Sequence, residues 1–180
     1  MKKQLFSTRR LVLDAVLIAL YIVLAFFKIQ LGNILRFNMA SFAVVMCAVA
    51  FGPVDGLIVG FLGEFLAQIL GPYGLTPTTV LWALPEAIRG GLLGLAIVGF
   101  KLMYKIKLVP YMAACIVTGI LASLANTFAL YVDSKMYGYY SYYMVFGVLV
   151  TRLTIAVVLS GCFGLISRTV IAALKRNKLI

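Results

Sequence analysis

Charged residues stand inside apolar segments of this sequence, at a spacing that suits ligand recognition. The stretch LPEAIRGG (84–91) places Glu86 and Arg89 at positions i and i+3, on one face of a helix. Glu64 and Arg152 lie in two other apolar segments. An arginine fork holds a ligand carboxylate through paired hydrogen bonds, and a glutamate accepts N–H donors. These residue types predict a polar pocket for a ligand that carries both groups.

The composition indicates why such charges need a pocket. Of the 180 residues, 64% are hydrophobic and 12% are charged, a balance typical of integral membrane proteins and too apolar for a soluble domain. Long unbroken apolar runs favour helices over the alternating strands of a membrane barrel. A charge at the centre of a membrane helix costs about 2.5–3.5 kcal/mol. The four charges are therefore expected to face the protein interior or a hydrated cavity.

The apolar runs predict an all-α fold, an integral membrane bundle of six transmembrane helices in a single substrate-binding domain, residues 1–180. A span needs about 20 apolar residues. The expected helices cover residues 11–29, 39–51, 56–70, 79–104, 109–132 and 143–174. The first apolar run follows a basic start but is too long for a signal peptide, so this helix is predicted to be retained. The stretch GPVD (52–55) is predicted as a tight turn.

The distribution of lysine and arginine predicts that the N- and C-termini are both cytoplasmic. In that orientation eleven basic residues lie in inside segments, and three, Lys28, Arg36 and Lys135, lie in outside segments. This excess obeys the positive-inside rule. The remaining two, Arg89 and Arg152, fall within spans.

With this topology the four buried charges share one level of the membrane. Glu86 and Arg89 lie roughly 10–15 Å below the outer end of their helix, and Glu64 and Arg152 lie at a similar depth. Further side chains at compatible depths would supply stacking and hydrogen bonds. These are Asn38, Tyr73, Trp82, Asn126 and Tyr131.

Two features leave alternatives open. The charges are either a ligand site or two structural ion pairs, for example Glu86 with Arg89. The tyrosine-rich segment 133–143 is either an interfacial anchor, as is common in membrane proteins, or an aromatic lid over an outward-facing cavity. Small residues at helix-packing spacing, such as Gly56 and Gly60, are interpreted as ordinary packing within the bundle.

Several kinds of site are excluded. The chain has no histidine, which excludes a histidine proton relay, metal site or general base. It has no GxxxxGK[ST] loop, so it does not hydrolyse ATP by that mechanism. Cys47, Cys115 and Cys162 lie in apolar runs without metal-ligand spacing and are expected to be small buried hydrophobes. No catalytic residue, metal or cofactor is predicted, and the protein is not expected to be an enzyme.

Three longer stretches carry a resemblance to a known family. They are TRRLVLDAVLIALYIVLAFF, which contains Ala15-x-x-x-Ala19, then FGPVDGLIVGFLGEFLAQIL, then RGGLLGL. With six expected helices, the chain resembles the substrate-binding (S) component of an energy-coupling factor (ECF) vitamin transporter, most closely its folate family. The resemblance covers most of residues 8–100 and is weaker afterwards.

The resemblance implies a function and partners. Such proteins bind one vitamin from outside and dock on a transmembrane coupling protein with two cytosolic ATPase subunits, in the bacterial cytoplasmic membrane. Ala15 and Ala19 would form the docking surface. If the vitamin is folate, Arg36, Arg89 and Arg152 would meet its carboxylates. Glu64 or Glu86 would then meet the donor edge of its pterin.

Other functions stay open at this stage. Pantothenate, another acidic vitamin, would also suit an arginine-lined pocket. Intramembrane charges are typical of ion-coupled secondary transporters as well, although no internal repeat is visible in the sequence. An intramembrane enzyme or a structural membrane subunit is a further alternative. For an enzyme, the glutamates would be the only groups available as a base.

Overall fold

The computed structural model of the chain describes residues 8–27, 29–31, 35–37, 39–72, 74–99 and 108–176, without the side chains of 29–31, 35–37, 174 and 175. Over these residues the chain forms six α-helices, a two-stranded antiparallel hairpin and one turn of π-helix. The helices are α1 (Thr8–Phe26), α2 (Ser41–Phe51), α3 (Pro53–Ile69), α4 (Thr79–Gly99), α5 (Leu108–Met136) and α6 (Leu149–Arg176). The strands are β1 (Ile29–Leu31) and β2 (Leu35–Phe37), and the π-helical turn is η1 (Tyr143–Gly147).

The prediction of six helices is confirmed, but several boundaries differ from it. The predicted turn 52–55 shrinks to Gly52, which has a φ of 105°, because Pro53 suits the first turn of a helix and starts α3. Helix α5 runs to Met136 and takes Asp133, predicted to lie in a connection, into its last turn. The predicted loop 31–38 contains most of the hairpin. Each strand has only three residues, too few for the longer alternating run that predicts a strand.

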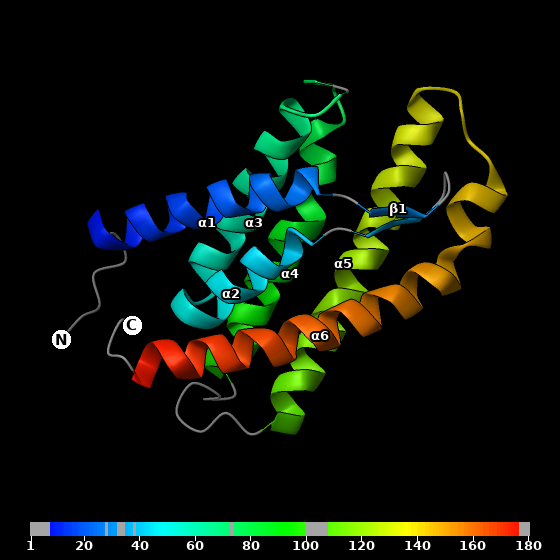
Figure 1. Cartoon of the computed structure of the whole chain (residues 1–180). Coiled ribbons are helices and arrows are strands. Elements are labelled where there is room, and N and C mark those ends of the chain that lie inside the picture. Colours follow the sequence, from blue (N-terminus) through cyan, green and yellow to red (C-terminus); the bar gives the residue numbers. More distant parts are fainter. Residues whose placement is uncertain are drawn as a thin grey trace.

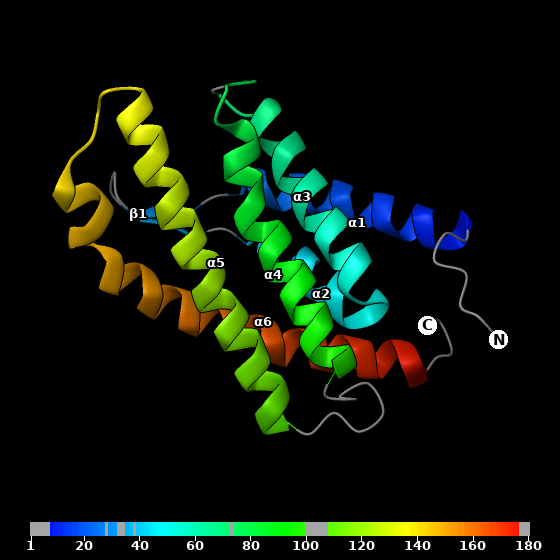
Figure 2. The ribbon, with the colours of Figure 1, turned by 180° about the vertical axis from the view of Figure 1, so that it is seen from behind.

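The helices differ in how they relate to a membrane. Helices α4 and α5, and the segment Tyr143–Ala173, are long and apolar enough to cross one. Helix α2 has 11 residues and rises only about 16 Å, half of a bilayer core. It is apolar on all sides and contacts α1, α3, α4 and α6, so it fills the interior of the bundle. In Figures 1 and 2, α3, α4 and α5 lie side by side while α1 and α6 run across them.

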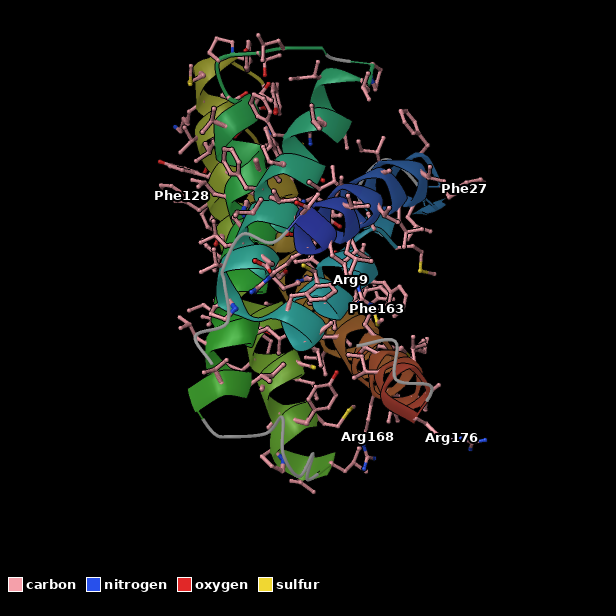
Figure 3. All side chains as sticks on the ribbon, turned by 90° about the vertical axis from the view of Figure 1, so that its left-hand side faces the viewer. Arg9, Phe27, Phe128, Phe163, Arg168 and Arg176 are labelled. Carbon is pink, nitrogen blue, oxygen red and sulfur yellow. The ribbon has the colours of Figure 1, made fainter. Side chains whose placement is uncertain are left out.

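Large apolar side chains cover the outside of the bundle. Phe27 and Phe128 are 69% and 60% exposed and project outward in Figure 3, whereas Phe163 points into the core. In a membrane this apolar surface contacts lipid. Cys162, predicted to be buried, is exposed, because lipid solvates a small apolar side chain as well as the core does.

Glycines allow α3 and α4 to pack backbone against backbone. A Cβ on Gly60 would collide with the main-chain carbonyl of Glu86, and a Cβ on Gly90 would collide with that of Gly56. The predicted packing role of these glycines is confirmed. Their contact also holds the backbone of Glu86 in a fixed position against α3, which matters for the site described below.

Substitutions at two adjacent glycines of α4 should therefore differ in effect. Gly90→Ala is expected to lower the melting temperature in detergent by roughly 2–12 °C, because overpacking costs about 1–3 kcal/mol. Gly91→Ala is the matched control, since its new Cβ would meet Leu57 at 3.5 Å, an ordinary contact. Equal melting temperatures for the two variants would contradict the packing described.

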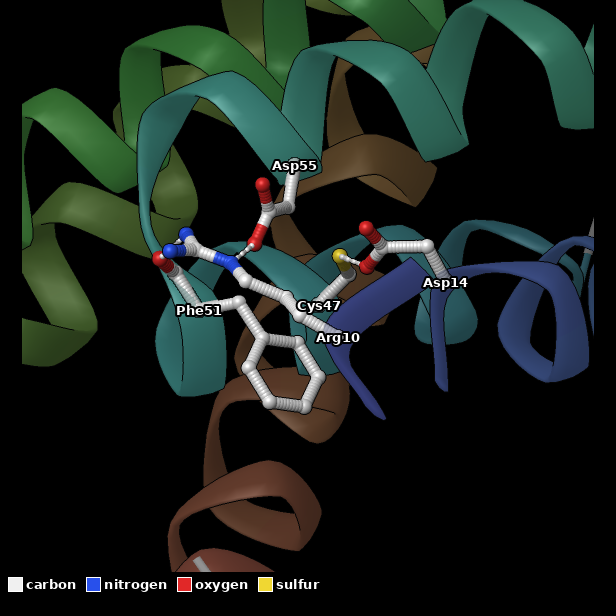
Figure 4. A network of polar contacts seen from close by, with 5 residues as sticks. All are labelled: Arg10, Asp14, Cys47, Phe51 and Asp55. Carbon is white, nitrogen blue, oxygen red and sulfur yellow. Dashed lines mark hydrogen bonds and ion pairs between the residues drawn. The ribbon is translucent and has the colours of Figure 1, made fainter. Parts of the chain in front are cut away.

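Helix α1 is joined to the bundle by polar contacts as well as by a buried apolar cluster that it shares with α2 and α3. Figure 4 shows Arg10 on α1 paired with Asp55 on α3 and donating to the Phe51 carbonyl at 2.6 Å. In the same view the thiol of Cys47 donates to Asp14 at 3.7 Å. Asp14 is a buried acid that the sequence reasoning did not single out. These contacts turn the opposite, apolar face of α1 outward.

Candidate functional site

A cavity of about 620 Å³ lies among α3, α4, α5 and α6. This volume is within the range of small-molecule sites, about 300–1,000 Å³. The connections that follow α3 and α5 contribute to its wall through Thr76, Thr78, Tyr137 and Tyr139. Both connections lie at the same end of the bundle in Figure 1. The cavity is therefore bounded by helices along its length and by two connections at that end.

Six of the predicted site residues line this cavity. They are Glu64, Trp82, Glu86, Arg89, Asn126 and Arg152. Asn38 and Tyr73 lie outside the described residues, and the side chain of Arg36, on β2, is also outside them. All four charges predicted at membrane depth thus meet at one cavity although they come from three helices. Their role in binding stays a prediction.

The four charges differ in how they are paired. Among the described residues, Glu86 and Arg89 form a loose ion pair of 3.8 Å, and Ser41, the first residue of α2, donates to the same Glu86 oxygen at 2.7 Å. Arg152 has no carboxylate within ion-pair distance in that part of the chain; its Nη2 donates to the Met144 carbonyl at 2.9 Å. The Glu86–Arg89 pair of the ion-pair alternative is therefore present, whereas Arg152 forms no ion pair with a described residue, and a ligand site stays a prediction.

Three buried polar atoms of these residues have no hydrogen-bond partner in the part of the chain that the structure describes. They are Oε2 of Glu86, Nε of Arg89 and Nη1 of Arg152. An unpaired buried donor or acceptor costs about 1–3 kcal/mol, and more when it is charged. All three belong to residues that line the cavity. The site thus offers two donors and one acceptor to whatever enters it.

Glu64 is held differently from Glu86. The hydroxyl of Tyr21, on α1, donates to one Glu64 oxygen at 2.5 Å, and Gln68 donates to the other at 2.6 Å. Gln68 also lines the cavity and was missed by the sequence reasoning. Its position four residues after Glu64 places both side chains on one helix face. This spacing was the sequence signal that could have predicted Gln68 as a site residue.

A third acid, Asp133, lines the cavity near the end of α5 and was also missed by the sequence reasoning. It is buried and accepts hydrogen bonds from Thr78, from Trp82 Nε1 at 3.3 Å, and from Tyr139. We refer to these four residues as the Asp133 cluster. The cluster joins α4, α5 and both connections at that end of the cavity.

The tyrosines of the tyrosine-rich segment differ in their surroundings. Tyr137 and Tyr139 line the cavity, as a lid would, whereas Tyr142 and Tyr143 are 70% and 64% exposed, as anchors would be. Tyr131, predicted at the site, instead packs against the rings of Tyr140 and Phe146 and lines a separate apolar hollow. The position of Tyr131 on α5 points its side chain away from the cavity.

A comparison with protein families identifies this architecture. The family described as "ECF transporter, substrate-specific component" matches residues 9–174 of the chain. The chain belongs to this family. As an S component it is a substrate-binding membrane protein of a transport system and is not an enzyme.

A solved structure has the same fold as this S component. It is described as "Structure and mechanism of the S component of a bacterial ECF transporter" and superimposes with a TM-score of 0.62 at 23% sequence identity. The match covers 93% of this chain and 98% of that chain. A comparison with curated proteins gave no match. The resemblance noted in the sequence is therefore confirmed for the family.

Proposed function

We propose that the cavity captures an acidic vitamin, folate in the first place, from outside the cell. The observation that carries this proposal is a set of buried atoms that have no hydrogen-bond partner among the described residues, on the wall of a cavity of about 620 Å³. They are two arginine donors and one glutamate acceptor. A ligand that satisfies all three needs an anionic acceptor and an N–H donor. Folate has both, in its carboxylates and in the donor edge of its pterin.

The contacts already present support a division of roles within the site. Arg89 and Arg152 would hold a carboxylate. Glu86 suits the donor edge better than Glu64 does, because both Glu64 oxygens already accept hydrogen bonds from Tyr21 and Gln68. Trp82, the single tryptophan of the chain, would stack on the heterocycle.

Pantothenate is a second candidate because of the charges in the wall. Three acids, Glu64, Glu86 and Asp133, face two arginines there. The acids outnumber the arginines by one, so the wall has no net positive charge, which suits one carboxylate better than two. Pantothenate has a single carboxylate together with an amide and hydroxyl donors.

Delivery of the vitamin would depend on partners. We propose that the protein is a multi-pass protein of the bacterial cytoplasmic membrane with both termini cytoplasmic, as its lysines and arginines indicate. Ala15 and Ala19 are exposed on α1, which supports their role as the docking surface for a transmembrane coupling protein. Two cytosolic ATPase subunits would supply the energy.

The test begins with the purified protein. It is isolated from cells grown in vitamin-replete medium, and any retained small molecule is identified by mass spectrometry. A vitamin panel is then titrated against the emission of Trp82. Tight binding of folate supports the proposal, and tight binding of pantothenate alone supports the second candidate. No retained molecule and no binding in the panel would count against both.

A further inference from the structure

The Asp133 cluster brings together two segments that are far apart in the sequence, 78–82 and 133–139. Thr78 precedes α4, Trp82 lies in the first turn of α4, and Tyr139 follows α5. All donate to the carboxylate of Asp133, which is 8% exposed. Every member of the cluster lines the cavity. One buried acid therefore accepts hydrogen bonds from two connections and from the tryptophan ring.

The turn at the end of α5 explains how Tyr139 reaches Asp133. Gly138 has a φ of 75°, in the left-handed region. The N–H of Tyr139 bonds the Ser134 carbonyl at 3.1 Å, and that of Tyr137 bonds the Asp133 carbonyl at 3.0 Å. These bonds form a left-handed helix cap, which turns the chain back so that the Tyr139 hydroxyl meets a side chain six residues earlier.

A carboxylate at this position is not explained by packing. An apolar side chain would end α5 at lower energetic cost in a membrane protein. Asp133 instead accepts hydrogen bonds on both oxygens, from donors that belong to the cavity wall. Hydrogen bonds to a charged group are the stronger kind, so these contacts can hold the wall segments together.

We propose that Asp133 is a positioning residue that fixes the Trp82 ring in the cavity wall and fastens the connection 137–142 to Thr78. This inference rests on the proposed function, in which the cavity holds a vitamin. Opening that end of the cavity requires Tyr139 and Thr78 to leave Asp133. The cluster thereby sets how fast a bound vitamin escapes, while the arginines and Glu86 recognise it.

The first test uses no vitamin. Trp82 is the only tryptophan, so its quenching by acrylamide reports how far solvent reaches the cavity wall. Tyr139→Phe and Asp133→Asn are expected to raise the quenching constant about twofold or more and to shift the emission maximum. Tyr140→Phe is the matched control, because it removes a hydroxyl from the next residue, whose ring packs on Tyr131.

The second test measures release of folate by stopped flow with Trp82 emission. Loss of one hydrogen bond to a charged group predicts about tenfold faster dissociation for Tyr139→Phe, with the Tyr140→Phe rate unchanged. If wild-type protein binds no folate, the quenching test still decides the inference separately from the substrate. If Asp133→Asn does not fold, Tyr139→Phe decides it. Unchanged quenching in Tyr139→Phe would overturn the proposal.

Discussion

Arg152→Ala is expected to weaken binding of the vitamin by about 2–5 kcal/mol, which is roughly 30- to 4,000-fold in affinity. Its guanidinium is oriented by the Met144 carbonyl, and its buried Nη1 has no hydrogen-bond partner among the residues that the structure describes. A ligand carboxylate would accept a hydrogen bond from Nη1, and the Arg152→Ala variant removes this donor. Calorimetric titration with folate, or with the vitamin retained on purification, measures the loss.

The stability of the ligand-free protein distinguishes this role from a structural one. Arg152 has no ion-pair partner among the described residues, so removing its charge should leave the melting temperature unchanged or higher. A structural ion pair would instead lower it, since breaking a buried pair is strongly destabilising. Thr154→Val is the control on the same helix, because its exposed hydroxyl donates only to the Val150 carbonyl of α6. Full affinity in Arg152→Ala would contradict the proposed site.

Ala15→Trp is expected to leave vitamin affinity intact and to reduce uptake by about tenfold or more. Ala15 and Ala19 lie four residues apart on the outward face of α1, where small side chains allow close contact between helices in lipid. An indole there would separate the two surfaces. Affinity is measured by calorimetry on the purified protein, and uptake is measured in cells or vesicles that contain the complete transporter.

The matched control for Ala15→Trp places the same bulk on another helix. Val158 on α6 is 58% exposed, and Val158→Trp should affect neither binding nor uptake. If Ala15→Trp abolished vitamin binding, the substitution would have disturbed the fold of the protein, and the docking assignment would be wrong. If both tryptophan variants blocked uptake equally, the loss would reflect bulk at the lipid surface in general.

The sequence by itself determined the fold class and most charges of the site. Backbone polar groups inside a membrane must bond within their own segment, so long apolar runs translate directly into helices. A charge within such a run has few places to lie other than a shared interior. For that reason Glu64, Glu86, Arg89 and Arg152 could be assigned to one cavity from their position alone.

Only the tertiary structure decided which side chains complete the site. Asp133 stands at the end of an apolar run beside a tyrosine-rich segment, and its function depends on Thr78 and Trp82, more than 50 residues away. Tyr131 and Asp133 are two residues apart in the sequence. Because of the rotation of α5 about its axis, Tyr131 packs against Phe146 whereas Asp133 lines the cavity. The depth of a residue in the membrane follows from its distance along a helix. The direction in which its side chain points depends on how the helices pack, and packing brings together residues that no local sequence pattern connects.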